Sequence, residues 1–238
     1  MNPTRELADD SRIAASGNPL PFAPDAQGRE LTLDEAIAVA ILLQRNQQFS
    51  EAETLYRWIL ASVPDHPEAL HYAGVLAQQR GRSDEAVVLM QRSLAREPGR
   101  ADWQSNLGIA YQAQARVDEA IAAFSRAIEL DPQHANAHSN LGVLLASLQR
   151  NQEAVACFCK ALTLRPKHPD ARKLLALAHC AIGEVDAAIR IFEDWLVEEP
   201  ANPIARHMLA ACTGRDVPAR ASDGFVTDTF ATFKNAVY

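Results

Sequence analysis

Residues 101–134 read ADWQSNLGIAYQAQARVDEAIAAFSRAIELDPQH, and their pattern decides the fold. Apolar residues recur at three- and four-residue intervals over residues 107–111 and again over residues 120–127. This spacing places apolar side chains on one face of an α-helix. The acidic residues Asp118 and Glu119 open the second run, where the positive end of the helix dipole favours carboxylates. The stretch therefore predicts two helices with a break between them.

The same pattern returns along the chain with a period of 34 residues. Two columns keep this step without a slip: Pro64, Pro98, Pro132, Pro166 and Pro200, and Ala52, Ala86, Ala120, Ala154 and Ala188. Each proline ends a unit, because it lacks an N–H group and its ring clashes with the preceding turn. A glycine or alanine stands twelve residues before each alanine, and a large apolar residue stands four residues after it. Such alternation of small and large side chains allows neighbouring helices to approach closely.

These units resemble the tetratricopeptide repeat (TPR) family. The family's pattern is present in Asn106-Leu107-Gly108, Tyr111, Ala120, Phe124, Ala127 and Pro132. Five units match, 33–66, 67–100, 101–134, 135–168 and 169–202, and a sixth begins at Pro203 and is lost after Thr213. The resemblance implies an all-α fold, a right-handed α-solenoid of stacked antiparallel helix pairs. It also implies that the chain binds a protein or peptide segment in a concave groove.

Bulk composition narrows the class of partner. The net charge of −7 argues against nucleic acid or an anionic membrane, because binding phosphates requires clustered Lys and Arg. No apolar run is long enough to span a membrane, so a cytoplasmic protein is expected. Residues 1–30 predict a flexible leader without an export signal, residues 31–213 the solenoid, and residues 214–238 a linker with an amphipathic C-terminal helix.

Candidate contact residues come from the first helix of each unit, which lines the groove in proteins that resemble this one. The second positions are acidic in four of five units: Asp34, Glu68, Asp102, Asn136 and Asp170. Two interpretations remain open, complementarity to the helix dipole and an acidic rim that selects a basic peptide. At the sixth positions, Asn106 and Asn140 resemble an asparagine ladder that holds peptide backbone in the solenoid of O-linked N-acetylglucosamine transferases. Tyr72 and Lys173 complete the predicted set of groove contacts.

No catalytic motif or metal site is expected. His134 and His138 lie four residues apart, but no third ligand accompanies them. Cys157 and Cys159 point away from each other on a helix, so we interpret them as buried apolar side chains and expect all cysteines to remain thiols. We find no glycine-rich phosphate loop, HExxH motif or nucleophile elbow, and therefore expect neither a cofactor nor enzyme activity.

The C-terminal tail carries an apolar stripe that includes Phe230 and Phe233. Three interpretations remain open: the stripe seals the last repeat, it mediates self-association, or it belongs to a further domain. The exposed terminal repeats are a second candidate surface for self-association. The further domain has a resemblance behind it, because residues 217–233 resemble the joint in bacterial proteins where TPR units precede an S-adenosylmethionine-dependent methyltransferase domain. That resemblance implies an alternative function, the partner- or substrate-recruiting region of such an enzyme, whose catalytic domain is absent from this chain.

Overall fold

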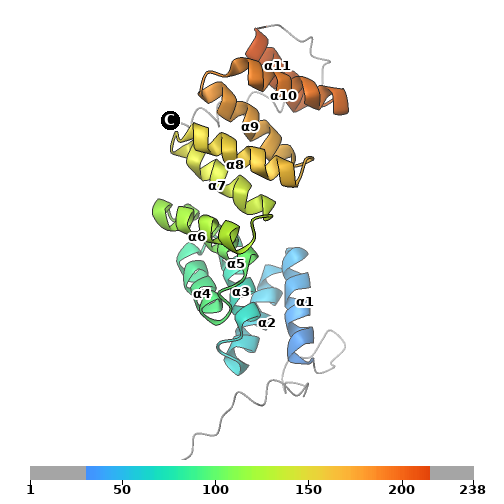
Figure 1. The fold of residues 1–238 in the computed structure, drawn as a ribbon. Coiled ribbons are helices and arrows are strands. Elements are labelled where there is room, and N and C mark those ends of the chain that lie inside the picture. Colours follow the sequence, from blue (N-terminus) through green and yellow to red (C-terminus); the bar gives the residue numbers. More distant parts are fainter. Residues whose placement is uncertain (1–30, 215–238) are drawn as a thin grey trace, which may run out of the picture. The chain divides into compact units, whose positions relative to one another are not determined.

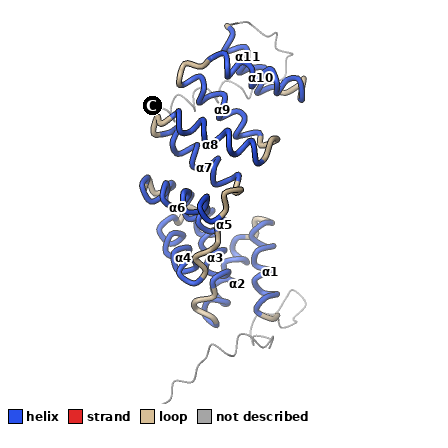
Figure 2. The backbone as a smooth tube through the Cα atoms, viewed as in Figure 1, coloured by secondary structure: helices blue, strands red, loops and turns tan. Residues whose placement is uncertain are grey.

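The computed structural model describes residues 31–214, which fold into eleven α-helices without a β-strand (Figures 1 and 2). The chain divides into two compact units, Met1–Gln114 and Ala115–Tyr238, called the N-terminal and C-terminal units below. The all-α class predicted from the 34-residue period is confirmed. The division into leader, solenoid and tail stays a prediction.

The N-terminal unit contains α1 to α5 in chain order (Figure 1): α1 (Leu33–Arg45), α2 (Phe49–Ser62), α3 (Pro67–Gln79), α4 (Ser83–Arg96) and α5 (Ala101–Ala113). Each helix packs against the next, and α3 also contacts both α1 and α5. The first helices of successive pairs are therefore neighbours. We call the surface formed by α1, α3 and α5 the first-helix face.

The C-terminal unit contains the remaining helices: α6 (Val117–Leu130), α7 (Ala135–Ser147), α8 (Asn151–Leu164), α9 (Pro169–Ala181), α10 (Val185–Glu198) and α11 (Pro203–Thr213). Here too each helix packs against its successor, and α7 contacts α9. Helix α11 begins and ends at the residues that the sequence pattern gives for the partial sixth unit.

The repeated small and large residues form the core. All five alanines of the repeated column are 0% exposed, as are Phe124, Phe158 and Phe192 four residues later in their units. The helices approach closely at the glycines. A Cβ atom on Gly142 would lie 2.8 Å from Cε1 of Phe158, and one on Gly74 would lie 2.8 Å from Cγ of Met90. Packing of the small residues against the large ones thus sets the distance between the helices of a pair.

The turn inside each helical pair has one residue with a left-handed backbone. The φ angles are 61° at Gln47, 75° at Gly81, 55° at Ala115, 60° at Gln149 and 82° at Gly183. These positions repeat every 34 residues, so every pair uses the same turn. Glycine adopts this conformation without the clash that a Cβ atom causes, whereas glutamine and alanine adopt it at a cost.

Histidines cap three of the first helices. Nδ1 of His66, His134 and His168 accepts a hydrogen bond from the backbone N–H three residues later, at 3.3, 3.1 and 3.3 Å. A capping side chain satisfies one of the free N–H groups at the start of a helix. His134 therefore caps α7, while Nε2 of His138 lies 3.2 Å from the carbonyl oxygen of Pro132.

Candidate functional site

Predicted contact residues meet on α3 and α5 of the first-helix face. Glu68 and Tyr72 lie on α3, and Asp102 and Asn106 lie on α5, in each case four residues apart and thus on one side of the helix. Val75 and Ile109 follow at the next helical position. Asp102 and Ile109 are exposed, and the other four are partly exposed. Two adjacent helices therefore present the same series: a carboxylate, a hydrogen-bonding side chain and an aliphatic one.

The fifth positions of α3, α5 and α7 are buried and do not belong to the exposed surface of these helices. His71 is 1% exposed, Ser105 3% and Ser139 5%. Lys173 is the exception, because it is half-buried on α9. The buried fifth positions support the surface residues from beneath.

His71 and Asn106 join α3 to α5. The Nδ2 group of Asn106 lies 3.1 Å from Nε2 of His71. In this amide orientation Nε2 of His71 accepts from the amide nitrogen, which assigns the proton of the neutral ring to Nδ1, a buried atom without a hydrogen-bond partner in the described residues. Burial lowers the pKa of His71 to about 4, which agrees with this assignment. The contact fixes the side-chain amide of Asn106 and leaves its oxygen as an acceptor.

Trp103 supports the ring of His71. The two rings are stacked, with centroids 4.6 Å apart and planes 10° from parallel. The Arg100 guanidinium carbon lies 4.2 Å from the Trp103 ring centroid, and Arg100 also pairs with Glu97 at 3.1 Å and with Asp102 at 3.5 Å. A cation over an aromatic face is stabilised by the ring quadrupole.

A second polar contact follows the same spacing. Nε2 of Gln44 on α1 donates to Oε1 of Gln79 on α3 at 2.9 Å, and Tyr56 OH donates to Oε1 of Gln44 at 3.0 Å. Gln44 and Gln79 are 35 residues apart, as are His71 and Asn106. Adjacent first helices thus meet at residues separated by one repeat plus one position. His71 is recognised when polar residues 35 positions apart are compared, but not when each repeat is considered alone.

The remaining predicted contact residues lie on α7 and α9 of the C-terminal unit. Oδ1 of Asn136 accepts a hydrogen bond from Arg165 at 3.0 Å, so its side chain already has a partner. Asn140 is half-buried on α7, and Asp170 is exposed in the first turn of α9. Within the described part of the chain, Lys173 makes no ion pair. The structure thus groups the predicted residues into one set on α3 and α5 and another on α7 and α9.

The acidic residues at the second positions are compatible with both interpretations drawn from the sequence, complementarity to the helix dipole and selection of a basic peptide. Asp34, Glu68, Asp102 and Asp170 each lie in the first turn of a helix, where a carboxylate complements the dipole. Asp102 also faces a cation of the chain, Arg100. Selection of a basic partner by this column stays a prediction.

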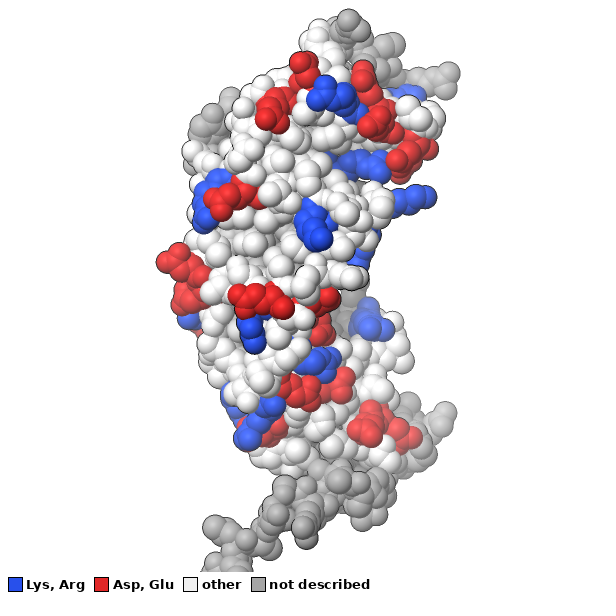
Figure 3. Space-filling model, in the orientation of Figure 1, with Lys and Arg blue, Asp and Glu red and all other residues white. Residues whose placement is uncertain are grey.

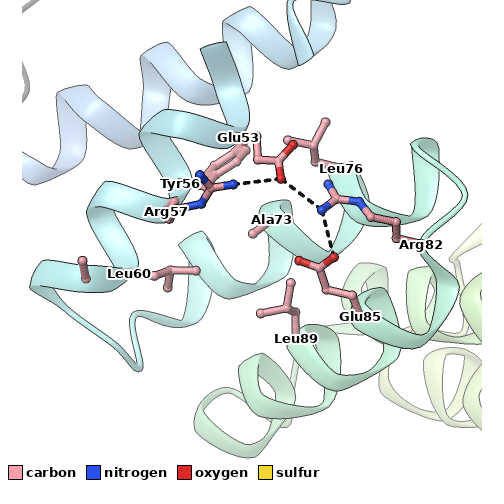
Figure 4. Close-up of a pocket in the computed structure, with 10 residues that line it drawn as sticks. Glu53, Tyr56, Arg57, Leu60, Ala73, Leu76, Arg82, Glu85 and Leu89 are labelled. Atoms are coloured by element: carbon pink, nitrogen blue, oxygen red, sulfur yellow. Dashed lines mark hydrogen bonds and ion pairs between the residues drawn. The ribbon is translucent and has the colours of Figure 1, made fainter. Parts of the chain in front are cut away.

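A cleft of about 430 Å³ lies between α2, α3 and α4 (Figure 4). Glu53 occupies its polar end, where it contacts Arg57 at 3.2 Å and Arg82 at 3.0 Å and also pairs with Arg80. Burial opposes ionisation of Glu53, but the arginines outweigh it and lower its pKa. Leu60, Leu76 and Leu89 line the apolar part. Because Arg82 is also paired with Glu85 at 3.0 Å, the charges of the cleft are largely satisfied within the chain.

The cysteines correct one interpretation from the sequence. Cys157 is half-buried and packs on the core, but Cys159 is exposed, so its interpretation as a buried apolar side chain is wrong. Residues two apart on a helix face different surroundings, and here one faces solvent. Sγ of Cys180 and Sγ of Cys212 lie 3.7 Å apart, a contact that their 32-residue separation did not predict. Over residues 31–214, no group of three metal-ligating side chains gathers.

None of the helices in the described part of the chain combines the length and the apolar character that crossing a membrane requires. On the face drawn in Figure 3, several Lys and Arg side chains stand beside Asp and Glu side chains, and others stand apart from them. Phe230, Phe233 and the methyltransferase-like joint lie outside the described residues.

Comparison with known proteins places the chain among repeat proteins. Models of the tetratricopeptide repeat match residues 37–106, 105–169 and 145–212. No curated protein sequence matches the chain. Three solved structures are similar. TTC0263, a thermophilic TPR protein of Thermus thermophilus, has a TM-score of 0.60 and 23% identity, and the match covers 76% of this chain and 98% of that chain. PilF of Pseudomonas aeruginosa has a TM-score of 0.67 and 21% identity, with 76% of this chain and 84% of that chain covered. YrrB, described as a TPR protein with an unusual peptide-binding site, has a TM-score of 0.60 and 21% identity, with 73% of this chain and 90% of that chain covered. At these identities the likeness shows the fold.

Proposed function

Because the chain belongs to the tetratricopeptide repeat family, we propose that it is a protein-interaction scaffold that binds a peptide or protein segment along the first-helix face. TPR proteins are generally non-catalytic scaffolds. An unusual peptide-binding site is described for the similar structure YrrB. The contacts of the proposed site are Glu68, Tyr72, Asp102 and Asn106. Asn136, Asn140, Asp170 and Lys173 are proposed as a separate set of contacts within the C-terminal unit.

One observation carries the proposal, the fixed side-chain amide of Asn106. Its nitrogen is held by His71, which is buried and stacked on Trp103. An amide that is already oriented binds a partner's backbone N–H without losing further rotamer freedom. Asn106 therefore suits the recognition of peptide backbone, which does not depend on the partner's side chains.

The neighbours of Asn106 indicate the chemistry of the partner. Ile109 is 39% exposed, and Tyr72 and Val75 are partly exposed across from it on α3. These side chains suit an apolar residue of the partner. Glu68 and Asp102 at the other end of the same series suit an amine or a guanidinium. We therefore propose an extended segment that combines basic and aliphatic residues.

A peptide library displayed on phage tests this proposal. Peptides selected on the full chain are synthesised, and their affinity is measured by isothermal titration calorimetry. We expect Asn106→Ala and Tyr72→Ala each to weaken binding by about five- to a hundredfold, because each removes a contact worth about 1–3 kcal/mol.

Val88→Ala is the matched control, since Val88 is 54% exposed on α4, a second helix. It should leave affinity unchanged. Circular dichroism verifies that all variants fold. Equal affinity of the wild-type chain, Asn106→Ala and Tyr72→Ala for every selected peptide would remove the first-helix face as the binding site.

The second candidate function is recruitment for a methyltransferase. It rests on the resemblance of residues 217–233 to the joint between TPR units and an S-adenosylmethionine-dependent domain. Reading the coding sequence beyond Tyr238 tests it. A strand followed by a glycine-rich loop would support a bacterial TPR–methyltransferase fusion, and a stop codon directly after Tyr238 would contradict it.

Self-association through Phe230 and Phe233 is a further proposal, supported by their place in an apolar stripe. Light scattering of the full chain and of a chain without residues 222–238 tests it, and equal masses would contradict it.

We also propose a cytoplasmic location, on the basis of the acidic composition and the polar N-terminal residues. Cell fractionation tests that location, and recovery in a membrane or secreted fraction would contradict it.

A further inference from the structure

The last turns of α9 and α11 bring two cysteines together. Cys180 is the penultimate residue of α9, and Cys212 is the penultimate residue of α11. Their sulfur atoms lie 3.7 Å apart, which is a direct contact between thiols. Helix α10 packs against both helices, so it holds the two ends in place. The pair thus arises from the stacking of successive first helices and not from a flexible loop.

Both thiols lie at the edge of the core. They are half-buried and pack against a cluster that includes Phe192, Trp195 and Met208. A disulfide has an S–S length of about 2.05 Å, so the sulfurs must close a gap of about 1.6 Å. Such a movement is on the scale of a side-chain rotation.

We propose that Cys180 and Cys212 form an intramolecular disulfide when a small-molecule disulfide such as oxidised glutathione is present. One cysteine thiolate attacks a sulfur of glutathione disulfide, the S–S bond of the oxidant breaks, and one glutathione thiolate leaves. The second cysteine then attacks the protein sulfur of this mixed disulfide and releases the second glutathione. The two protons of the protein thiols end on the two glutathione thiols, so the protein loses two electrons and the oxidant gains them.

The environment of the pair sets the conditions for this reaction. Burial raises the pKa of Cys180 to about 11, and the neighbouring Cys212 contributes to the rise. Because the thiolate is the nucleophile, the disulfide should form faster as the pH rises from 7 toward 9. At neutral pH the pair reacts slowly and responds to sustained oxidising conditions.

The bond has a clear structural effect. It connects α9 to α11 across α10 and closes a loop over residues 180–212, which restricts the unfolded chain. The helix that benefits most is α11, which packs against α10. Oxidation therefore links α11 covalently to α9 and leaves the residues of the first-helix face unchanged.

The other two cysteines provide the matched background for a test. Cys157→Ser and Cys159→Ser are combined in the full chain, which leaves only Cys180 and Cys212 as thiols. This chain is incubated with oxidised glutathione, alkylated, digested without reductant and analysed by mass spectrometry. We expect a peptide pair joined through Cys180 and Cys212 within one chain. We also expect a melting temperature raised by roughly 5–10 °C, with the rise abolished by dithiothreitol.

Cys180→Ala and Cys212→Ala, each in the same background, should lose both the joined peptides and the rise in melting temperature while keeping the helical circular dichroism spectrum. A rise in melting temperature on oxidation of either variant, as large as in the parent chain, would overturn the proposal. So would an oxidised parent chain in which Cys180 and Cys212 stay alkylated, carry only glutathione, or connect two chains.

Discussion

His71 shows how one buried residue links the stability of the chain to the proposed binding face. It is 1% exposed, and its charged neighbours are Asp102, which raises its pKa, and Arg100, which lowers it. Burial is the largest influence and lowers the pKa of His71 to about 4. In the unfolded chain a histidine has a pKa near 6.5. The unfolded chain therefore binds a proton between about pH 6.5 and pH 4 that the folded chain does not bind.

This difference predicts a loss of stability in acid. As the pH falls from 7 to 5, the native state should lose about 2 kcal/mol of unfolding free energy through His71. His71→Phe removes the titrating group but keeps a ring against Trp103. Urea denaturation at pH 7 and pH 5 should therefore show a loss that is about 2 kcal/mol smaller in the variant. An equal loss in both proteins would contradict the assignment, and between pH 7 and pH 8 the two should behave alike.

The neutral state of His71 also has a consequence for recognition. Since the folded protein keeps this histidine neutral down to about pH 5, Nε2 continues to accept from Asn106. Peptide affinity at the first-helix face should therefore stay constant over a range in which stability falls.

At the scale of the elements, the approach of α7 to α8 depends on one glycine. An added Cβ atom at Gly142 would lie 2.8 to 3.0 Å from three ring atoms of Phe158, and Phe158 is itself 0% exposed. The aromatic ring has no room to move aside, since interiors are close-packed. The small residue of this pair therefore sets the distance between α7 and α8.

Gly142→Ala tests this directly. We expect it to lower the free energy of unfolding by about 1–3 kcal/mol through overpacking, although alanine favours a helix over glycine by about 1 kcal/mol. Gly99→Ala is the control, because no atom lies within 4 Å of the added Cβ atom there. It should change stability by less than about 0.5 kcal/mol in a urea titration. An unchanged or raised stability of Gly142→Ala would show that the helices separate at low cost.

At the scale of the whole molecule, the period determines most of the architecture. The 34-residue columns locate the helices and the core, because every unit repeats the same packing of alanine against a large side chain. The site is predicted only in part. Tyr72 and Asn106 follow from family positions, but His71 becomes visible only when neighbouring units are compared at a step of 35 residues. The contact between Cys180 and Cys212 joins residues 32 positions apart, so a comparison at a step of 35 residues does not find it.

The turns inside the helical pairs lie outside all of these contacts, yet they are built from one backbone conformation. Glycine occupies the left-handed position at Gly81 and Gly183, whereas Gln47 and Gln149 adopt it with a side chain. Gln47→Gly and Gln149→Gly should each raise the free energy of unfolding by about 0.5–1 kcal/mol, because the clash of Cβ is larger than the entropic cost of glycine. The gains should add, since the two residues lie in different units.

Urea denaturation of the single and double variants measures these gains, and a loss of stability in either single variant would contradict them. The turns are thus positions where heat resistance can be engineered without altering recognition. A more durable scaffold that binds the same peptides is accessible through glycine at the left-handed turn positions alone.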